Sequence, residues 1–106
     1  MSDKKIISLL GIAKKAGKTV SGTDMTVQSI RKKASSVKVI LLACDASANT
    51  VKRISNTGSY YSVPIITLSI GKEELGSYVN GGAELSVVGI TDIGFAEAMK
   101  KATEKD

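Results

Sequence analysis

The first hydrophobic pattern in the chain predicts an amphipathic helix followed by a short strand. Between Lys4 and Ala16, apolar side chains recur at the i, i+3, i+4 and i+7 spacing of one helical face, at Ile6, Leu9, Leu10 and Ala13. Gly17 is expected to end this helix, and residues 19–21 are expected to form a strand. A second helix is predicted to open at Gly22, with an inward face made of Val27, Ile30 and Ala34.

The middle of the chain predicts a buried strand, a helix and a second strand. Residues 37–43 are almost continuously apolar, which is typical of a strand covered on both faces. Asp45 and Ser47 are helix-start signals. The helix that follows is predicted to run to about Thr57 and to stop at Gly58, with Val51 and Ile54 inward. The next strand covers residues 63–68, with Pro64 near its start.

The C-terminal part continues this alternation of helices and strands. We predict a short helix over residues 72–79, a turn at Gly81 and Gly82, a strand over residues 85–90, and a final helix after Asp92 with Phe95, Met99 and Ala102 inward. Strands separated by helices favour βαβ units. The predicted fold class is therefore α/β, a three-layer α/β/α sandwich with a small, four-stranded mixed sheet, and residues 1–106 are expected to form a single domain.

Composition favours a polyanionic partner and excludes several catalytic sites. Fifteen Lys and Arg residues outnumber ten Asp and Glu residues, giving a formal charge of +5. Nucleic acid is the first candidate partner, although such a charge also serves to keep a small domain soluble. The chain has no His, which excludes Ser-His and Cys-His catalysis and His-based zinc sites. Its one cysteine, Cys44, is expected to be an inert buried thiol.

The N-terminal apolar stretch does not have the length of a signal or membrane segment. It is interrupted by Gly11 and by Lys14 and Lys15. We therefore expect a cytoplasmic protein without membrane contact.

Residues 11–19 read GIAKKAGKT, which superficially matches the phosphate-binding loop G-x-x-x-x-G-K-[ST]. Five residues separate Gly11 from Gly17 where the loop requires four, and no strand precedes Gly11, so we do not expect nucleotide binding here. What remains is a basic patch of Lys14, Lys15 and Lys18 at the helix exit, suited to phosphate contacts.

Two carboxylates support an alternative, enzymatic interpretation. Asp45 and Asp92 each follow a predicted strand, so they could meet at one edge of the sheet, bind a metal ion or small molecule and perform acid-base chemistry. Each also directly precedes a helix, where a carboxylate caps free backbone amides. We favour capping, and keep a small metal-dependent or small-molecule-binding enzyme as the alternative.

The order of several motifs resembles one family of RNA-binding ribosomal proteins. Residues 20–47 read VSGTDMTVQSIRKKASSVKVILLACDAS, and SVPI, EELG and TDIGFA follow at residues 62–65, 73–76 and 91–96. This order is similar to the L7Ae/L30e family, whose members bind kink-turns, sharply bent RNA helices. Residues 9–22 and 45–56 resemble its bacterial YlxQ-type members. The resemblance implies the α/β sandwich, non-catalytic binding of structured RNA in ribosomal or other RNA, and no cofactor, metal or small-molecule substrate.

The resemblance also implies where RNA would bind. In the family, the start of the second helix enters the widened groove at sheared G·A pairs, and the loop before the last strand holds a flipped-out base. Together with the cations near these parts, the expected RNA-binding residues are Lys14, Lys15, Lys18, Ser21, Gly22, Thr23, Asp24, Met25, Gln28, Arg31, Lys32, Asn80, Gly81, Gly82, Ala83, Glu84 and Leu85.

Three residues depart from the family pattern. The Asn-Glu pair of the family falls on Asp24 and Met25, and its later Lys falls on Gln28. Asp24 accepts hydrogen bonds but donates none, Met25 has no carboxylate for guanine, and Gln28 keeps an amide that both donates and accepts. RNA binding is still expected, with Gln28 as the residue that contacts a base edge.

Overall fold

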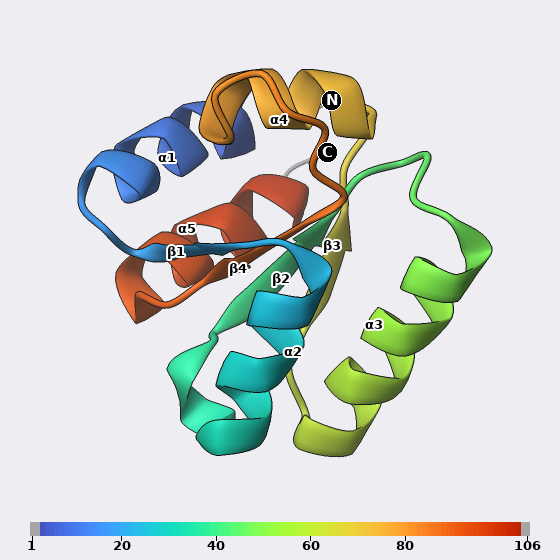
Figure 1. The fold of residues 1–106 in the computed structure, drawn as a ribbon. Helices are drawn as coiled ribbons and strands as arrows, with labels where there is room; N and C mark the ends of the chain where they lie inside the picture. Colours follow the sequence, from blue (N-terminus) through green and yellow to red (C-terminus); the bar gives the residue numbers. More distant parts are fainter. Residues whose placement is uncertain (1–2, 105–106) are drawn as a thin grey trace.

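The computed structural model describes residues 3–104 and has a four-stranded sheet between two layers of helices (Figure 1). The helices are α1 (Asp3–Lys15), α2 (Thr23–Lys32), α3 (Ala48–Tyr61), α4 (Lys72–Val79) and α5 (Ile93–Glu104), with a 3-10 turn, η1 (Ala34–Ser36). The strands are β1 (Thr19–Ser21), β2 (Val39–Leu42), β3 (Ile65–Thr67) and β4 (Val87–Ile90), in the order β1-β4-β2-β3. Strand β4 is antiparallel to both neighbours and β2 is parallel to β3. The predicted α/β/α sandwich with a mixed sheet is confirmed.

The two central strands are buried on both faces because their side chains alternate between two cores. Val39 and Leu41 point to a core shared with α1, α4 and α5, whereas Ile40 and Leu42 point to a core shared with α2 and α3. Figure 1 shows the same division, with α2 and α3 on one side of the sheet and α1, α4 and α5 on the other. This explains the continuous apolar run of β2, since either face must exclude water.

Helix α3 is longer than predicted because Gly58 does not end it. Gly58 lies buried inside the helix, where an added Cβ would be 2.8 Å from Cδ1 of Ile65 and 2.9 Å from the carbonyl oxygen of Val63. The glycine therefore serves close packing, and the helix ends only at Tyr61, where Ser62 adopts the left-handed conformation with φ 59°. Val51, expected inside, is 38% exposed, whereas Ile54 is buried as predicted.

Two other expectations from the sequence are wrong. Helix α2 ends at Lys32, and Ala34 lies in η1 instead of on the helix; the orientation of its side chain lies outside the described structure. Cys44 is exposed, because the chain turns away from the sheet after Ala43. The backbone N–H of Cys44 donates to the carbonyl oxygen of Ile70 at 2.9 Å, which ties this turn to the start of α4.

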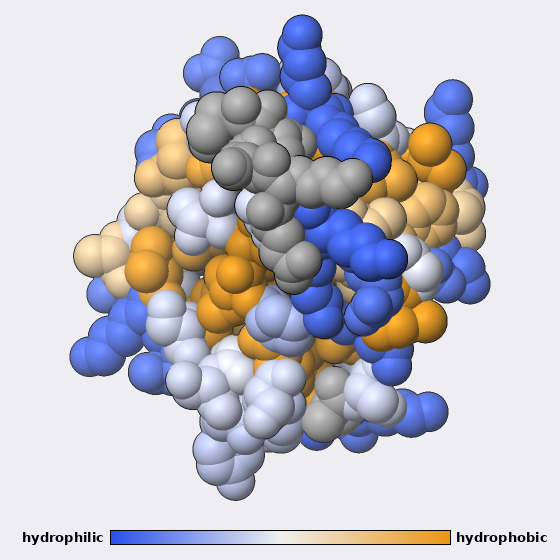
Figure 2. Space-filling view, turned by 180° about the vertical axis from the view of Figure 1, so that it is seen from behind, coloured by the Kyte–Doolittle hydropathy of each residue, from blue (hydrophilic) through white to orange (hydrophobic). Residues whose placement is uncertain are grey.

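The exposed apolar side chains are distributed over several elements. They include Ile12 on α1, Val51 on α3 and Ile93 on α5. In the view from behind, hydrophilic side chains project around the outline and the apolar surface forms separate patches (Figure 2). Among the described residues, no helix combines the length and the apolar character that crossing a bilayer would require.

Helix α2 lies close to the sheet because Gly89 has no side chain. A Cβ at Gly89 would lie 3.1 Å from Cγ2 of Thr26 and 3.1 Å from Cγ1 of Val37. Thr26 is completely buried, and its hydroxyl donates to the carbonyl oxygen of Val20 at 3.4 Å. Gly89 thus sets the distance at which α2 packs on β4.

Gly89→Ala should lower the free energy of unfolding by about 1 to 3 kcal/mol, because the methyl group overpacks the contact between α2 and β4. Urea denaturation followed by circular dichroism measures the change. Gly11→Ala is the matched control: a Cβ at Gly11 meets no atom within 4 Å, and replacing a glycine inside a helix should stabilise by about 0.5 to 1 kcal/mol. Equal effects of the two substitutions would contradict this account of Gly89.

Candidate functional site

The start of α2 presents backbone amides without a side-chain cap. Its N-cap residue is Gly22, with φ 98° and ψ 153° and no side chain to accept a hydrogen bond. By contrast, the hydroxyl of Ser47 caps α3 by accepting from the N–H of Thr50 at 3.2 Å. The first amides of a helix have no partner within the helix, and together with the helix dipole they favour an anion. The start of α2 therefore has the character of an anion-binding surface.

Strand pairing brings the start of α2 next to the loop that leads into β4. The N–H of Gly22 donates to the carbonyl oxygen of Val87 at 2.8 Å, and Ser21 is paired with Val88 in the sheet. The N–H of Ala43 donates to the carbonyl oxygen of Ser86 at 2.8 Å. Residues 21–25 and residues 80–85, both predicted from the sequence as site residues, thus lie at the same end of the strands of the sheet.

The loop over residues 80–85 is shaped by three glycines. Gly81 and Gly82 have φ values of 61° and 95°, a region that disfavours other residues. Gly76 of α4 lies beneath the loop, where an added Cβ would be 1.9 Å from the carbonyl oxygen of Ala83. The Asn80 amide donates to that same oxygen at 3.2 Å. These contacts give the loop a defined shape and leave Ala83 exposed.

Two residues of this loop that were predicted to bind RNA make contacts within the protein instead. Leu85, one of the expected RNA-binding residues, is only 6% exposed and belongs to the core under α1, α4 and α5, so its side chain offers no surface to RNA. Its N–H donates to the carbonyl oxygen of Lys72 at 3.0 Å. Glu84 lies with a carboxylate oxygen 4.0 Å from Nζ of Lys72. Lys72, which sequence reasoning did not single out, therefore adds a cation beside the loop.

The outward face of α2 carries the three residues that depart from the family pattern. Met25 is 57% exposed, and Gln28 is also exposed. Asp24 forms an ion pair with Arg53 of α3. Sequence reasoning missed Arg53 because it lies 29 residues from Asp24. The ion pair neutralises Asp24 and places a guanidinium group beside the first turn of α2.

The structure does not bring the predicted cations together. Lys14, Lys15 and Lys18 lie at the end of β1 opposite Gly22, since Thr19 pairs with Ile90 and the N–H of Thr91 donates to the carbonyl oxygen of Lys18. Arg31 and Lys32 lie in the last turn of α2. Phosphate contacts would therefore come from two separate regions.

The geometry of Asp45 and Asp92 contradicts a shared site. Because β2 and β4 are antiparallel neighbours, their C-terminal ends point in opposite directions. Asp45 and Asp92, which follow these strands, therefore lie at opposite ends of the sheet. Asp92 accepts from the N–H of Phe95 at 3.1 Å and so caps α5. Asp45 accepts from the N–H of Lys72 at 2.8 Å and so caps α4, not α3 as predicted. Within residues 3–104, no three His, Cys, Asp or Glu side chains gather as ligands for a metal ion.

Two remaining expectations concern Gly11 and Phe95. Gly11 lies inside α1, so residues 11–19 do not form a phosphate-binding loop. Phe95 is partly buried against the core, as expected. Tyr78 on α4 donates to a carboxylate oxygen of Glu74 at 3.1 Å, and this hydrogen bond raises the pKa of Tyr78 above its ordinary value. Tyr60 and Tyr61 lie at the end of α3, away from the loop.

Comparison with known proteins identifies relatives over nearly the whole chain. The model of the Ribosomal protein L7Ae/L30e/S12e/Gadd45 family matches residues 4–100. The chain is 36% identical to RNA-binding protein YlxQ of Enterococcus faecium over 101 residues, which cover 95% of this chain and 93% of that protein. It is 37% identical to RNA-binding protein YlxQ of Bacillus subtilis over 99 residues, 93% of this chain and 95% of that protein.

Solved structures with the same fold include two similar in size. A Bacillus halodurans protein of unknown function superposes with a TM-score of 0.84 at 26% identity, covering 94% of this chain and 97% of that one. The Giardia lamblia 15.5kD RNA binding protein superposes with a TM-score of 0.79 at 15% identity, covering 98% of this chain and 86% of that one. At that identity the second likeness concerns the fold alone.

Asp45→Ala and Asp92→Ala should each lower the free energy of unfolding by about 0.5 to 2 kcal/mol, because each removes a helix cap. Since the two caps lie at opposite ends of the sheet, the loss of unfolding free energy in the double variant should equal the sum of the two single losses within about 0.5 kcal/mol. Urea denaturation of both single variants and the double variant completes the cycle. A coupling energy well above that limit, or Mg²⁺ stabilisation abolished by either substitution, would restore the shared-site interpretation.

Proposed function

The chain belongs to the Ribosomal protein L7Ae/L30e/S12e/Gadd45 family, and from this premise we propose that it binds structured RNA and catalyses no reaction. The RNA is a kink-turn or a related bent helix in ribosomal RNA or another cellular RNA of the cytoplasm. The names of two relatives, both RNA-binding proteins, support the RNA partner. The observation that carries the proposal is the uncapped start of α2 beside the loop over residues 80–85.

The start of α2 suits the phosphate backbone at a bend. Its amides and dipole attract phosphate oxygens, and the absence of a Cβ at Gly22 lets a strand approach the backbone closely. Where the bend widens the groove, the exposed amide of Gln28 can donate to and accept from a base edge, and the exposed side chain of Met25 offers apolar contact. Backbone contacts would position the RNA, and Gln28 would supply sequence preference.

The loop over residues 80–85 suits an extruded base. Gly81, Gly82 and Ala83 are exposed and carry little side-chain bulk, so a flat base can approach the backbone. Leu85 contributes from below, by anchoring the loop in the core. Gly76 contributes likewise, since a larger residue there would collide with the carbonyl of Ala83.

The ion pair between Asp24 and Arg53 compensates for an unfavourable charge. An isolated carboxylate in the first turn of α2 would repel a phosphate and occupy the positive end of the helix dipole. With Arg53 beside it, the site has no net negative charge and gains a planar group with several hydrogen-bond donors, well suited to phosphate oxygens. We therefore add Arg53 and Lys72 to the RNA-binding residues.

Gln28→Lys should tighten binding to a standard kink-turn by about 1 to 2 kcal/mol, because a charge-assisted contact replaces a neutral one. Gln28→Ala should cost less on that RNA than on the natural partner, where a bidentate amide contact to a base is worth about 1 to 3 kcal/mol. The measurement is a titration of wild type and both variants against a duplex with tandem G·A pairs and a bend. The same duplex without the bend is the control. Equal affinity of wild type for bent and straight duplexes would refute the kink-turn proposal.

Binding should weaken linearly on a log-log scale as salt rises, because cations displace counterions from phosphates. Arg31→Gln should reduce the slope by about 0.9, and Lys14→Gln should reduce it by less than half as much, since Lys14 lies at the far end of β1. Titrations at several ionic strengths measure both slopes. A salt-insensitive complex, or a larger effect at Lys14, would contradict this placement of the RNA.

A further inference from the structure

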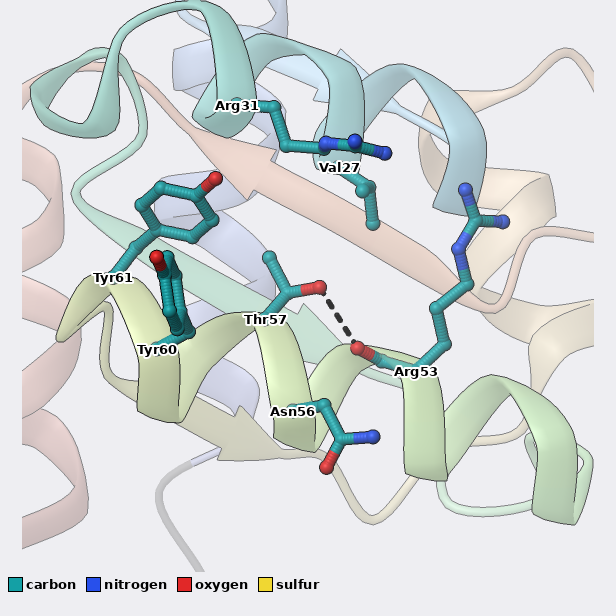
Figure 3. A pocket seen from close by; sticks show the side chains of 7 residues that line it. All are labelled: Val27, Arg31, Arg53, Asn56, Thr57, Tyr60 and Tyr61. Atoms are coloured by element: carbon teal, nitrogen blue, oxygen red, sulfur yellow. Dashed lines mark hydrogen bonds between the residues drawn. The ribbon is translucent and has the colours of Figure 1, made fainter.

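A shallow groove runs between α2 and α3 and shares Arg31 and Arg53 with the RNA-binding residues described so far (Figure 3). It has a volume of about 410 Å³, within the range of small-ligand sites. Val27 and Arg31 line it from α2, and Arg53, Thr57, Tyr60 and Tyr61 line it from α3. The groove thus combines apolar, cationic and aromatic groups from two helices that are separated in the sequence.

The cations and the aromatic rings occupy different parts of the groove. Figure 3 shows Arg53 pointing toward α2 at one end, Tyr60 and Tyr61 standing at the other, and Arg31 extending along α2 past Val27. The side chain of Arg31 makes no hydrogen bond or ion pair with any other residue of the described part, so its guanidinium group is free for an anion. This arrangement offers charge and a stacking surface to one ligand.

Tyr60 is unusually accessible for a large aromatic residue. It is 81% exposed, and its ring contacts that of Tyr61 edge to face, with ring centroids 4.8 Å apart and an angle of 78° between planes. The contact with Tyr61 restrains the ring, which reduces the entropy lost when a flat partner stacks on it. Aromatic rings placed beside cations are the usual platform for unpaired bases.

Charge in this region favours an anionic ligand. Helix α3 contains no acidic residue, and Asp24, the single acidic residue of α2, is paired with Arg53. From Thr23 to Ser62 the cations are Arg31, Lys32, Lys33, Lys38, Lys52 and Arg53, and the acids are Asp24 and Asp45. A phosphate chain is complementary to this surface.

We propose that the groove between α2 and α3 binds an unpaired nucleotide of the RNA that contacts the start of α2. Arg31 and Arg53 hold its phosphate, and its base stacks on Tyr60. This inference rests on the proposed function, because Arg53 belongs both to the groove and to the ion pair at the first turn of α2. A single strand that leaves the bent helix at that turn would continue directly along the groove.

The experiment compares a blunt bent duplex with the same duplex carrying a short unpaired extension, placed on each strand end in turn. Fluorescence anisotropy gives the dissociation constant of each RNA. Wild type should bind one extended RNA about tenfold more tightly than the blunt one, since stacking contributes that order of affinity per base. Tyr60→Ala should reduce this advantage to below about twofold while the affinity for blunt RNA stays unchanged.

Two control variants separate stacking from general effects. Tyr60→Phe keeps the ring and should keep the advantage, because stacking needs no hydroxyl. Tyr78→Ala removes a half-exposed tyrosine on α4, outside the groove, and should also keep it. Circular dichroism checks that all variants remain folded, as expected for substitutions at exposed side chains.

The inference is overturned if wild type binds blunt bent RNA but gains nothing from any extension, or if Tyr60→Ala keeps the full gain. Either result leaves the proposed function intact. If wild type prefers neither bent nor extended RNA to a straight duplex, the proposed function fails and the inference fails with it. If an acidic peptide binds and its affinity falls on Tyr60→Ala, while extensions have no effect, the groove is a protein-docking surface and the inference is wrong.

Discussion

The absence of a side chain at Gly89 is the steric constraint on which the position of α2 depends. With two neighbouring atoms at 3.1 Å from an added Cβ, α2 and β4 are as close as a glycine permits. This closeness lets the hydroxyl of Thr26 reach the backbone of Val20, so that α2, β1 and β4 form one unit. The start of α2 and the loop before β4 consequently keep a fixed relation to each other. The proposed interface, made of both segments, would then bind RNA without first ordering itself, which lowers the entropic cost of association.

Charge is distributed unevenly along the chain, and folding places most of the acidic residues outside the layer made of α2 and α3. Seven of the ten acidic residues follow Gly71: Glu73, Glu74, Glu84, Asp92, Glu97, Glu104 and Asp106. Some of the carboxylates cap helices or pair with lysines, as Asp92 and Glu84 do. Within residues 3–104, the layer made of α2 and α3 has cations without an acidic partner, and Arg31 is one of them. One helical layer is thereby suited to a polyanion while the rest of the molecule carries the balancing acids.

Much of the fold could be predicted from local sequence patterns, because these patterns set which face of each helix or strand is buried. The helical spacing of α1, the apolar run of β2 and the bounds of α4 could all be predicted, since each reflects a periodic face that must be buried. Gly58 could not, because a glycine that ends a helix and one that permits close packing look alike without the partner strand. The cap formed by Asp45 could not be predicted either, because its carboxylate accepts from the N–H of Lys72 in α4, 27 residues away. Arg53 shows the same limit for the site: no local signal marks a contact that exists only when two helices pack.

The order of strands has a consequence for behaviour at high concentration. The two strands at the edges of the sheet, β1 and β3, are three residues long, whereas the longer, wholly apolar strands β2 and β4 lie in the middle, covered by helices. An intruding strand from another molecule would find little backbone to pair with. Short edge strands of this kind disfavour edge-to-edge aggregation. The apolar strands β2 and β4 become accessible to another molecule only when the helices dissociate from the sheet.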